Sequence, residues 1–205
     1  MLDKKGLALA AMIGILMIII GVEYFILMIV FLAISIMATK YQYFPKKEMG
    51  IYEHERSWEN VLSNGFGPLI FALSSYWFGP IPYICSVSAV MSDKFASELG
   101  VLAGEPVSLK DFKKVRPGTS GAVSSFGTLM SLGGAILIGI AGIGLFGITP
   151  TQALIIGILG FLGSVIDSMF GVFEEMGIGT KGTTNFICSA SAGIIGILLI
   201  LWGIL

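Results

Sequence analysis

Long apolar stretches dominate this sequence, and they constrain the fold more than any other feature. A helix needs about 20 mostly apolar residues to cross the hydrocarbon core of a bilayer. Seven windows approach or exceed that length: 6–21, 24–39, 61–79, 81–98, 119–146, 150–173 and 184–205. Backbone polar groups inside a membrane must bond within their own segment, so such spans are helical. The sequence therefore predicts an all-α polytopic membrane protein with about seven transmembrane helices.

The composition leaves no room for a separate soluble domain. Hydrophobic residues make up 55% of the 205 residues and charged residues 12%, whereas a soluble domain carries about 25% charged residues. The net charge of −1 gives no basic surface for nucleic acid. We therefore expect one integral membrane domain over residues 1–205, multi-pass in the cell membrane, with no nucleic-acid partner.

The first apolar run contains one break, at Gly21-Val22-Glu23. A single helix over residues 6–38 would be about 50 Å long, well beyond the ~30 Å of a bilayer core. We predict a short hairpin of two helices, 6–21 and 24–39. One long tilted helix is the alternative.

The basic residues give an orientation. Lys and Arg occur before the first window and in the segments 40–60, 99–118 and 174–183, whereas the connections near 22, 79–82 and 146–150 contain none. With seven spans, all the basic segments fall on one side, and the positive-inside rule makes that side cytoplasmic. The expected topology has the N-terminus in the cytoplasm and the C-terminus outside.

Two carboxylates interrupt the apolar windows, Asp93 and Asp167. An Asp at the centre of a membrane helix costs about 2.5–3.5 kcal/mol on the insertion scale, so such residues are functional candidates by default. Glu98 follows Asp93 near the same end of its window. Carboxylate oxygens suit Mg²⁺. We predict that Asp93, Glu98 and Asp167 are catalytic and hold Mg²⁺.

A basic and glycine-rich segment precedes the fifth window. Lys113, Lys114 and Arg116 are followed by Pro117-Gly118-Thr119-Ser120-Gly121, where a helix is expected to begin. Free N–H groups at a helix start form an anion site, and carboxylates for Mg²⁺ with such an anion site are the parts that phosphoryl transfer needs. No G-x-x-x-x-G-K-[ST] sequence is present, which excludes a P-loop enzyme.

Further polar residues gather at the cytoplasmic ends of the windows. Arg56, Asn60 and Asn64 are spaced i, i+4, i+8 and share one helix face, and Ser92 and Ser97 stand close to Asp93 and Glu98. These clusters predict a polar pocket that opens to the cytoplasm at the depth of the lipid headgroups.

At these motifs the sequence resembles the phytyl-phosphate kinase family and its bacterial and archaeal relatives, over about residues 56–195. The resemblance is carried by Arg56-Ser-Trp-Glu-Asn60-Val-Leu-Ser-Asn64-Gly, Ser92-Asp93-x-x-Ala-Ser97-Glu98-Leu-Gly, Lys114-Val-x-Pro117-Gly-Thr119-x-Gly121, Gly127-Thr128, Gly163-Ser-x-x-Asp167-Ser168 and Asn185-Phe-x-x-Ser189. It implies a CTP-dependent kinase that converts an isoprenyl monophosphate into the diphosphate with Mg²⁺.

On that basis each polar group has an expected partner. CTP, or another nucleoside triphosphate, is expected to bind Lys113, Lys114, Arg116, Gly118, Thr119, Gly121, Ser168 and Asn185. The phosphate of the prenyl monophosphate lipid is expected to bind Arg56, Glu59, Asn60, Asn64, Ser92 and Ser97. Two alternatives stay open: a CTP:lipid-phosphate cytidylyltransferase that makes a CDP-linked lipid, and a small transporter or channel. The sequence is also compatible with a homo-oligomer.

Overall fold

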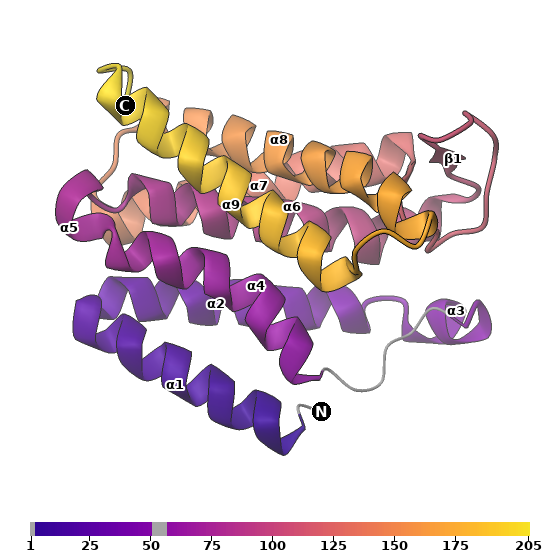
Figure 1. The fold of residues 1–205 in the computed structure, drawn as a ribbon, viewed down its shortest axis with the longest axis horizontal. Helices are drawn as coiled ribbons and strands as arrows, with labels where there is room; N and C mark the ends of the chain where they lie inside the picture. The colour runs from indigo at the N-terminus through magenta and orange to yellow at the C-terminus, as the bar shows by residue number, and fades with distance from the viewer. Residues whose placement is uncertain (1–2, 51–56) are drawn as a thin grey trace.

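The computed structural model describes residues 3–50 and 57–205, and this part of the chain is almost entirely helical (Figure 1). Its first half holds α1 Lys4–Ile20, α2 Val22–Lys40, α3 Tyr43–Glu48, α4 Trp58–Leu73 and α5 Ser75–Phe78. Its second half holds α6 Ile81–Gly100, a 3₁₀ turn Val101–Ala103, β1 Val107–Ser108, β2 Ala122–Val123, α7 Ser125–Phe146, α8 Pro150–Glu175 and α9 Lys181–Leu201. The helical class predicted from the apolar windows is confirmed.

Each predicted window contains a helix of the structure, but the lengths differ. In the described part of the chain, four helices are long and apolar enough to cross a membrane: α2, α7, α8 and α9. α1 and α4 have 17 and 16 residues, and the 20-residue α6 carries three charged side chains. The window 61–79 is divided at Ser74 between α4 and α5.

The first apolar run forms two helices, as the hairpin prediction requires. α1 ends at Ile20 and α2 begins at Val22, with Gly21 between them in an extended conformation. The Gly21 N–H donates to the carbonyl of Met17 at 3.0 Å and closes the last turn of α1. The single long helix is therefore excluded.

α6 lies at the centre of the bundle and contacts α2, α4, α7, α8 and α9. All its residues from Ile81 to Lys94 are buried, as expected for a helix surrounded by others. Ser88 Oγ lies 3.0 Å from the carbonyl of Ala135 and 3.3 Å from that of Ile156, which ties α6 to α7 and α8. Gly160 lets α8 pack directly on Ser88.

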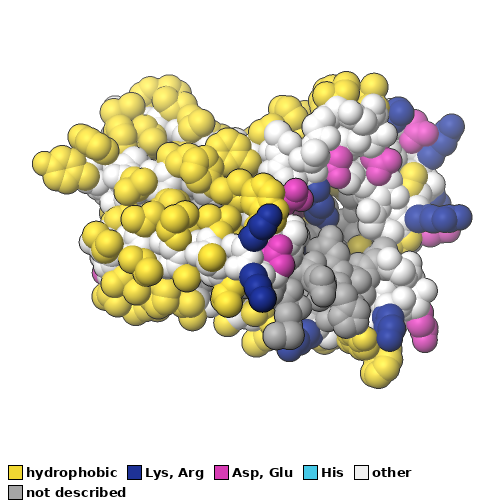
Figure 2. Space-filling model, turned by 60° about the horizontal axis from the view of Figure 1, so that its bottom comes forward, with side chains coloured by type: hydrophobic (Ala, Val, Ile, Leu, Met, Phe, Trp, Pro, Cys, Tyr) yellow, Lys and Arg dark blue, Asp and Glu magenta, His cyan; other side chains and the backbone are white. Residues whose placement is uncertain are grey.

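The two ends of the bundle differ in chemistry. Figure 1 shows α3, β1 and the α8–α9 connection at one end, and α5 and the C-terminus at the other. In Figure 2 Lys, Arg, Asp and Glu side chains gather over one end, while hydrophobic side chains cover the rest of that face. Below, the end with α3 and β1 is called the charged end.

Candidate functional site

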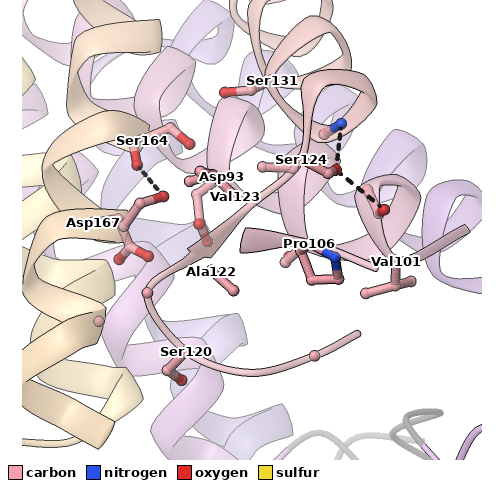
Figure 3. A pocket seen from close by; sticks show the side chains of 18 of the residues that line it. Asp93, Val101, Pro106, Ser120, Ala122, Val123, Ser124, Ser131, Ser164 and Asp167 are labelled. Carbon is pink, nitrogen blue, oxygen red and sulfur yellow. Dashed lines mark hydrogen bonds between the residues drawn. The ribbon is translucent and has the colours of Figure 1, made fainter. Parts of the chain in front are cut away.

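A cavity of about 610 Å³ opens at the charged end of the bundle. Its walls come from α6, α7 and α8, the first turn of α9, and the loop that joins β1 to β2 (Figure 3). Helices and a loop from distant parts of the sequence therefore contribute side chains to one cavity. The predicted polar pocket exists, although its lining differs from the predicted set.

Two carboxylates meet in this cavity. Asp93 of α6 and Asp167 of α8 both line the cavity, and their side chains face each other there (Figure 3). Asp93 is only 8% exposed, and Asp167 Oδ1 is buried with no hydrogen-bond partner among the described residues. Thr184 and Lys181, in the first turn of α9, line the same cavity and lie near Asp167. Two carboxylates in contact repel each other unless a proton or a cation lies between them.

The packing of α6 on α8 sets this pairing. Gly163 approaches Ala89 so closely that an added Cβ would lie 2.7 Å from the Ala89 methyl group. Asp93 and Asp167 stand four residues after Ala89 and Gly163, and residues four apart share a helix face. Both helices run toward the charged end, so one further turn brings the two carboxylates together.

Glu98 has different neighbours. Its carboxylate lies 3.1 Å from Lys46 Nζ and 3.8 Å from Lys94 Nζ, and it accepts a hydrogen bond from Thr39 Oγ1 at 2.7 Å. Lys46 is 1% exposed, and its ammonium group also donates to the carbonyls of Ala38 and Thr39. The three donors of Lys46 are therefore all used, and α3 is fastened to the end of α2.

The ion pairs of Glu98 argue against its place in the predicted metal site. Among the residues that the structure describes, no three Asp, Glu, His or Cys side chains are grouped to hold a metal ion. Glu98 is occupied by two lysines, so the geometry does not support it as a third ligand. Asp93 and Asp167 do fit Mg²⁺, which is commonly bound by one or two carboxylates together with substrate phosphates. The unpartnered oxygen of Asp167 is consistent with such a ligand.

The glycine-rich segment is a loop and not the start of a helix. Gly118 and Gly121 have φ values of 88° and 70°, which an α-helix does not allow. α7 begins at Ser125, and Ser124 Oγ accepts the Gly127 N–H as its cap at 3.0 Å. The predicted helix start at 119 is therefore wrong, whereas anion binding by this segment stays a prediction. Gly118, Thr119 and Gly121 still line the cavity.

The loop is held against the end of α8. An added Cβ on Gly121 would lie 2.6 Å from the backbone nitrogen of Val172, so this close approach requires glycine. Ser120 donates through its N–H to Glu175 at 3.1 Å and through its hydroxyl to Glu174 at 3.0 Å. These contacts make the loop one wall of the cavity.

The cations that line the cavity are not those predicted. Lys113 and Lys114 are exposed and pair with Asp111 and Glu105 of the connection between α6 and α7. Among the described residues, the cavity lining includes neither lysine, nor Arg116. Lys46, Lys94 and Lys181 line it instead. Sequence analysis missed Lys46 because its partner Glu98 lies 52 residues away. For Lys181 the sequence contains one local indication: the Thr180–Thr183 capping box marks the start of α9, where Lys181 is the first residue.

Most of the predicted lipid-phosphate residues lie outside the cavity, and Arg56 lies outside the described residues. Asn64 Nδ2 donates to the carbonyl of Asn60, and Asn185 Nδ2 lies 3.4 Å from Asn64 Oδ1. This amide pair ties α4 to α9. Glu59 is exposed in the first turn of α4.

The three predicted serines divide between the interior and the cavity. Ser92 is fully buried and bonds Ser131 Oγ at 2.7 Å. Ser97 and Ser168 line the cavity, and their hydroxyls donate to the carbonyls of Lys94 and Ser164.

Comparisons with known proteins agree with the membrane architecture. A family profile described as integral membrane protein DUF92 matches residues 1–199. An uncharacterized membrane protein of Methanocaldococcus jannaschii is 37% identical over 205 residues, which cover 97% of this chain and 85% of that protein. No solved structure matches the chain.

Proposed function

This chain belongs to the DUF92 family of integral membrane proteins, and we propose that it is a membrane-embedded kinase that uses CTP to convert an isoprenyl monophosphate into the diphosphate. One observation carries the proposal: a carboxylate pair, three lysines and a glycine- and hydroxyl-rich loop share one cavity at the charged end. Phosphoryl transfer requires positive charge around the phosphates and fixed positions for the reacting groups.

The proposed orientation places the charged end in the cytoplasm. Lys and Arg side chains of the described connections gather there, which is the arrangement of the positive-inside rule. We propose that α1, α4 and α6 cross the membrane together with α2, α7, α8 and α9, giving seven spans with the C-terminus outside. Soluble CTP would then reach the cavity directly.

In the proposed reaction an oxygen of the lipid phosphate bonds the γ-phosphorus of CTP, and the bond from that phosphorus to the β–γ bridging oxygen breaks. CDP leaves with the electron pair. Asp93 and Asp167 would hold Mg²⁺, which supplies positive charge to the phosphate oxygens. Lys94 of α6 and Lys181 of α9 would add positive charge, and the Gly118–Gly121 loop would limit access of water.

The test is an incubation of the protein in lipid nanodiscs with CTP, Mg²⁺ and prenyl monophosphates of increasing length, with both products identified by mass. Formation of prenyl diphosphate and CDP supports the proposal. Pyrophosphate and a CDP-linked lipid would identify a cytidylyltransferase instead. No turnover of any prenyl phosphate would refute both activities.

Two matched variants make the test specific to the cavity. Asp93→Asn removes one of the paired carboxylates and should reduce kcat at least about a hundredfold, as expected when an electrostatic contact of the transition state is lost. Asp111→Asn makes the same change in the exposed loop, where the carboxylate pairs only with Lys113, and should leave kcat within about twofold.

A further inference from the structure

On the side of the bundle, the wall of the cavity includes one exposed residue of α7 and one of α8. Thr128 of α7 and Val165 of α8 both line the cavity, and both are exposed, Val165 to 38%. Their helices are among those apolar enough to cross a membrane. The exposed wall residues on these two helices indicate a side opening toward lipid, whereas Gly118 and Lys181, exposed at the charged end, mark the opening toward water.

The packing of α7 on α8 limits how far this side opening extends. Near the opposite end of the bundle the helices are in contact, since an added Cβ on Gly139 would lie 2.5 Å from the Ala153 carbonyl oxygen. The contact continues to Ile136 and Gly157, where an added Cβ would lie 3.1 Å from Ile136. Thr128 stands eight residues before Ile136, or about 12 Å along the helix. The opening is thus a short slot, closed at its far end.

The chemistry of the wall changes along this slot. Inside are the Asp93–Asp167 pair and Lys94, and the α8 wall also includes Phe161 and Val165. Leu129, which follows Thr128, and Leu162, one turn before Val165, are exposed to 59% and 41%. A polar interior that continues into an apolar slot matches a ligand with a charged head and a hydrocarbon tail.

We propose that the slot between α7 and α8 holds the single hydrocarbon chain of a lipid monophosphate whose phosphate head lies beside Asp93 and Asp167. The inference rests on the proposed function and adds the place and direction of the lipid. The nucleotide uses the opening toward water, so the two substrates reach the same cavity through different openings.

Tryptophan substitutions that fill the slot test this assignment. Val165→Trp should raise the KM for a long-chain prenyl monophosphate about tenfold or more, because a bulky side chain would occupy the position of the lipid chain. The KM for CTP and for water-soluble dimethylallyl phosphate should change by less than about twofold. Ile158→Trp is the matched control, since Ile158 is 46% exposed on the same helix and is not part of the cavity wall.

A binding experiment on the unmodified chain separates this inference from the kinase itself. A farnesyl monophosphate with a photoreactive group on its chain is added to phosphatidylcholine vesicles that contain the protein, and the labelled residues are identified by mass spectrometry. Labelling at Thr128 and Val165 in excess over Ile158, removed by unlabelled farnesyl phosphate, supports the slot even if no kinase activity is found. Equal labelling at Ile158, or a Val165→Trp kinase that behaves like Ile158→Trp, would overturn it while leaving the kinase proposal intact.

Discussion

Replacing Glu98 with glutamine tests whether Glu98 is a counter-ion for the lysines or a ligand of the metal. Glutamine keeps the size of the side chain and an oxygen for Thr39, but it removes the negative charge beside Lys46 and Lys94. The Lys46 side chain is only 2% exposed, so water cannot solvate its ammonium group in place of the lost carboxylate. If Glu98 serves mainly to neutralise these lysines, the main effect of the variant should be a loss of stability.

The expected magnitude follows from the burial of the pair. Removing one partner of a buried ion pair costs about 3–5 kcal/mol. The Glu98 side chain is 17% exposed, so we expect Glu98→Gln to cost about 3 kcal/mol, the lower end. Lys46→Met leaves Glu98 beside Lys94 and Thr39 and loses two hydrogen bonds to carbonyls, about 1 kcal/mol each. The double variant should be more stable than the sum of the singles by about 1–3 kcal/mol.

The assay is reversible unfolding of the purified protein in mixed micelles, with helix content followed as the SDS fraction rises. Glu105→Gln is the control, because the Glu105–Lys114 pair is exposed and should be worth less than about 1 kcal/mol. Wild-type stability of Glu98→Gln with loss of kinase activity would refute the counter-ion assignment and support a role for Glu98 at the metal.

Three further outcomes are expected. Lys181→Ala should raise the KM for CTP or for the lipid phosphate about tenfold, because Lys181 lines the cavity and one charge-assisted bond is worth about 1.5–3 kcal/mol. Lys114→Ala should raise it by less than about twofold, because Lys114 is not in the cavity wall. The opposite ranking in steady-state kinetics would contradict this. Gly171→Ala should abolish activity with unchanged helical circular dichroism, since the new methyl group would meet the Gly121 backbone; an active variant would show that the loop packs elsewhere. A reporter that works only in the cytoplasm should be silent when fused after Leu205, and strong activity would mean an even number of spans or an inverted protein.

The sequence alone determined the class of the protein and the position of its carboxylates. Apolar runs of bilayer length leave the helix as the only stable backbone, so every predicted window contains a helix, and the break at Gly21 separated the first two. Asp93 and Asp167 could be identified because a carboxylate in an apolar helix is costly wherever the helix packs. These inferences depend on local chemistry, which does not change with the arrangement of the helices.

Only the tertiary structure decided which charges meet. Lys113 and Lys114 form a conspicuous basic run, yet they pair within their loop, while Lys46 reaches Glu98 across 52 residues because α3 folds back on the end of α2. The glycine-rich segment became a loop because Gly121 packs against α8 with a positive φ, a contact that no local pattern contains. Ion pairs and close backbone approaches depend on distances between helices, and those distances are set by packing.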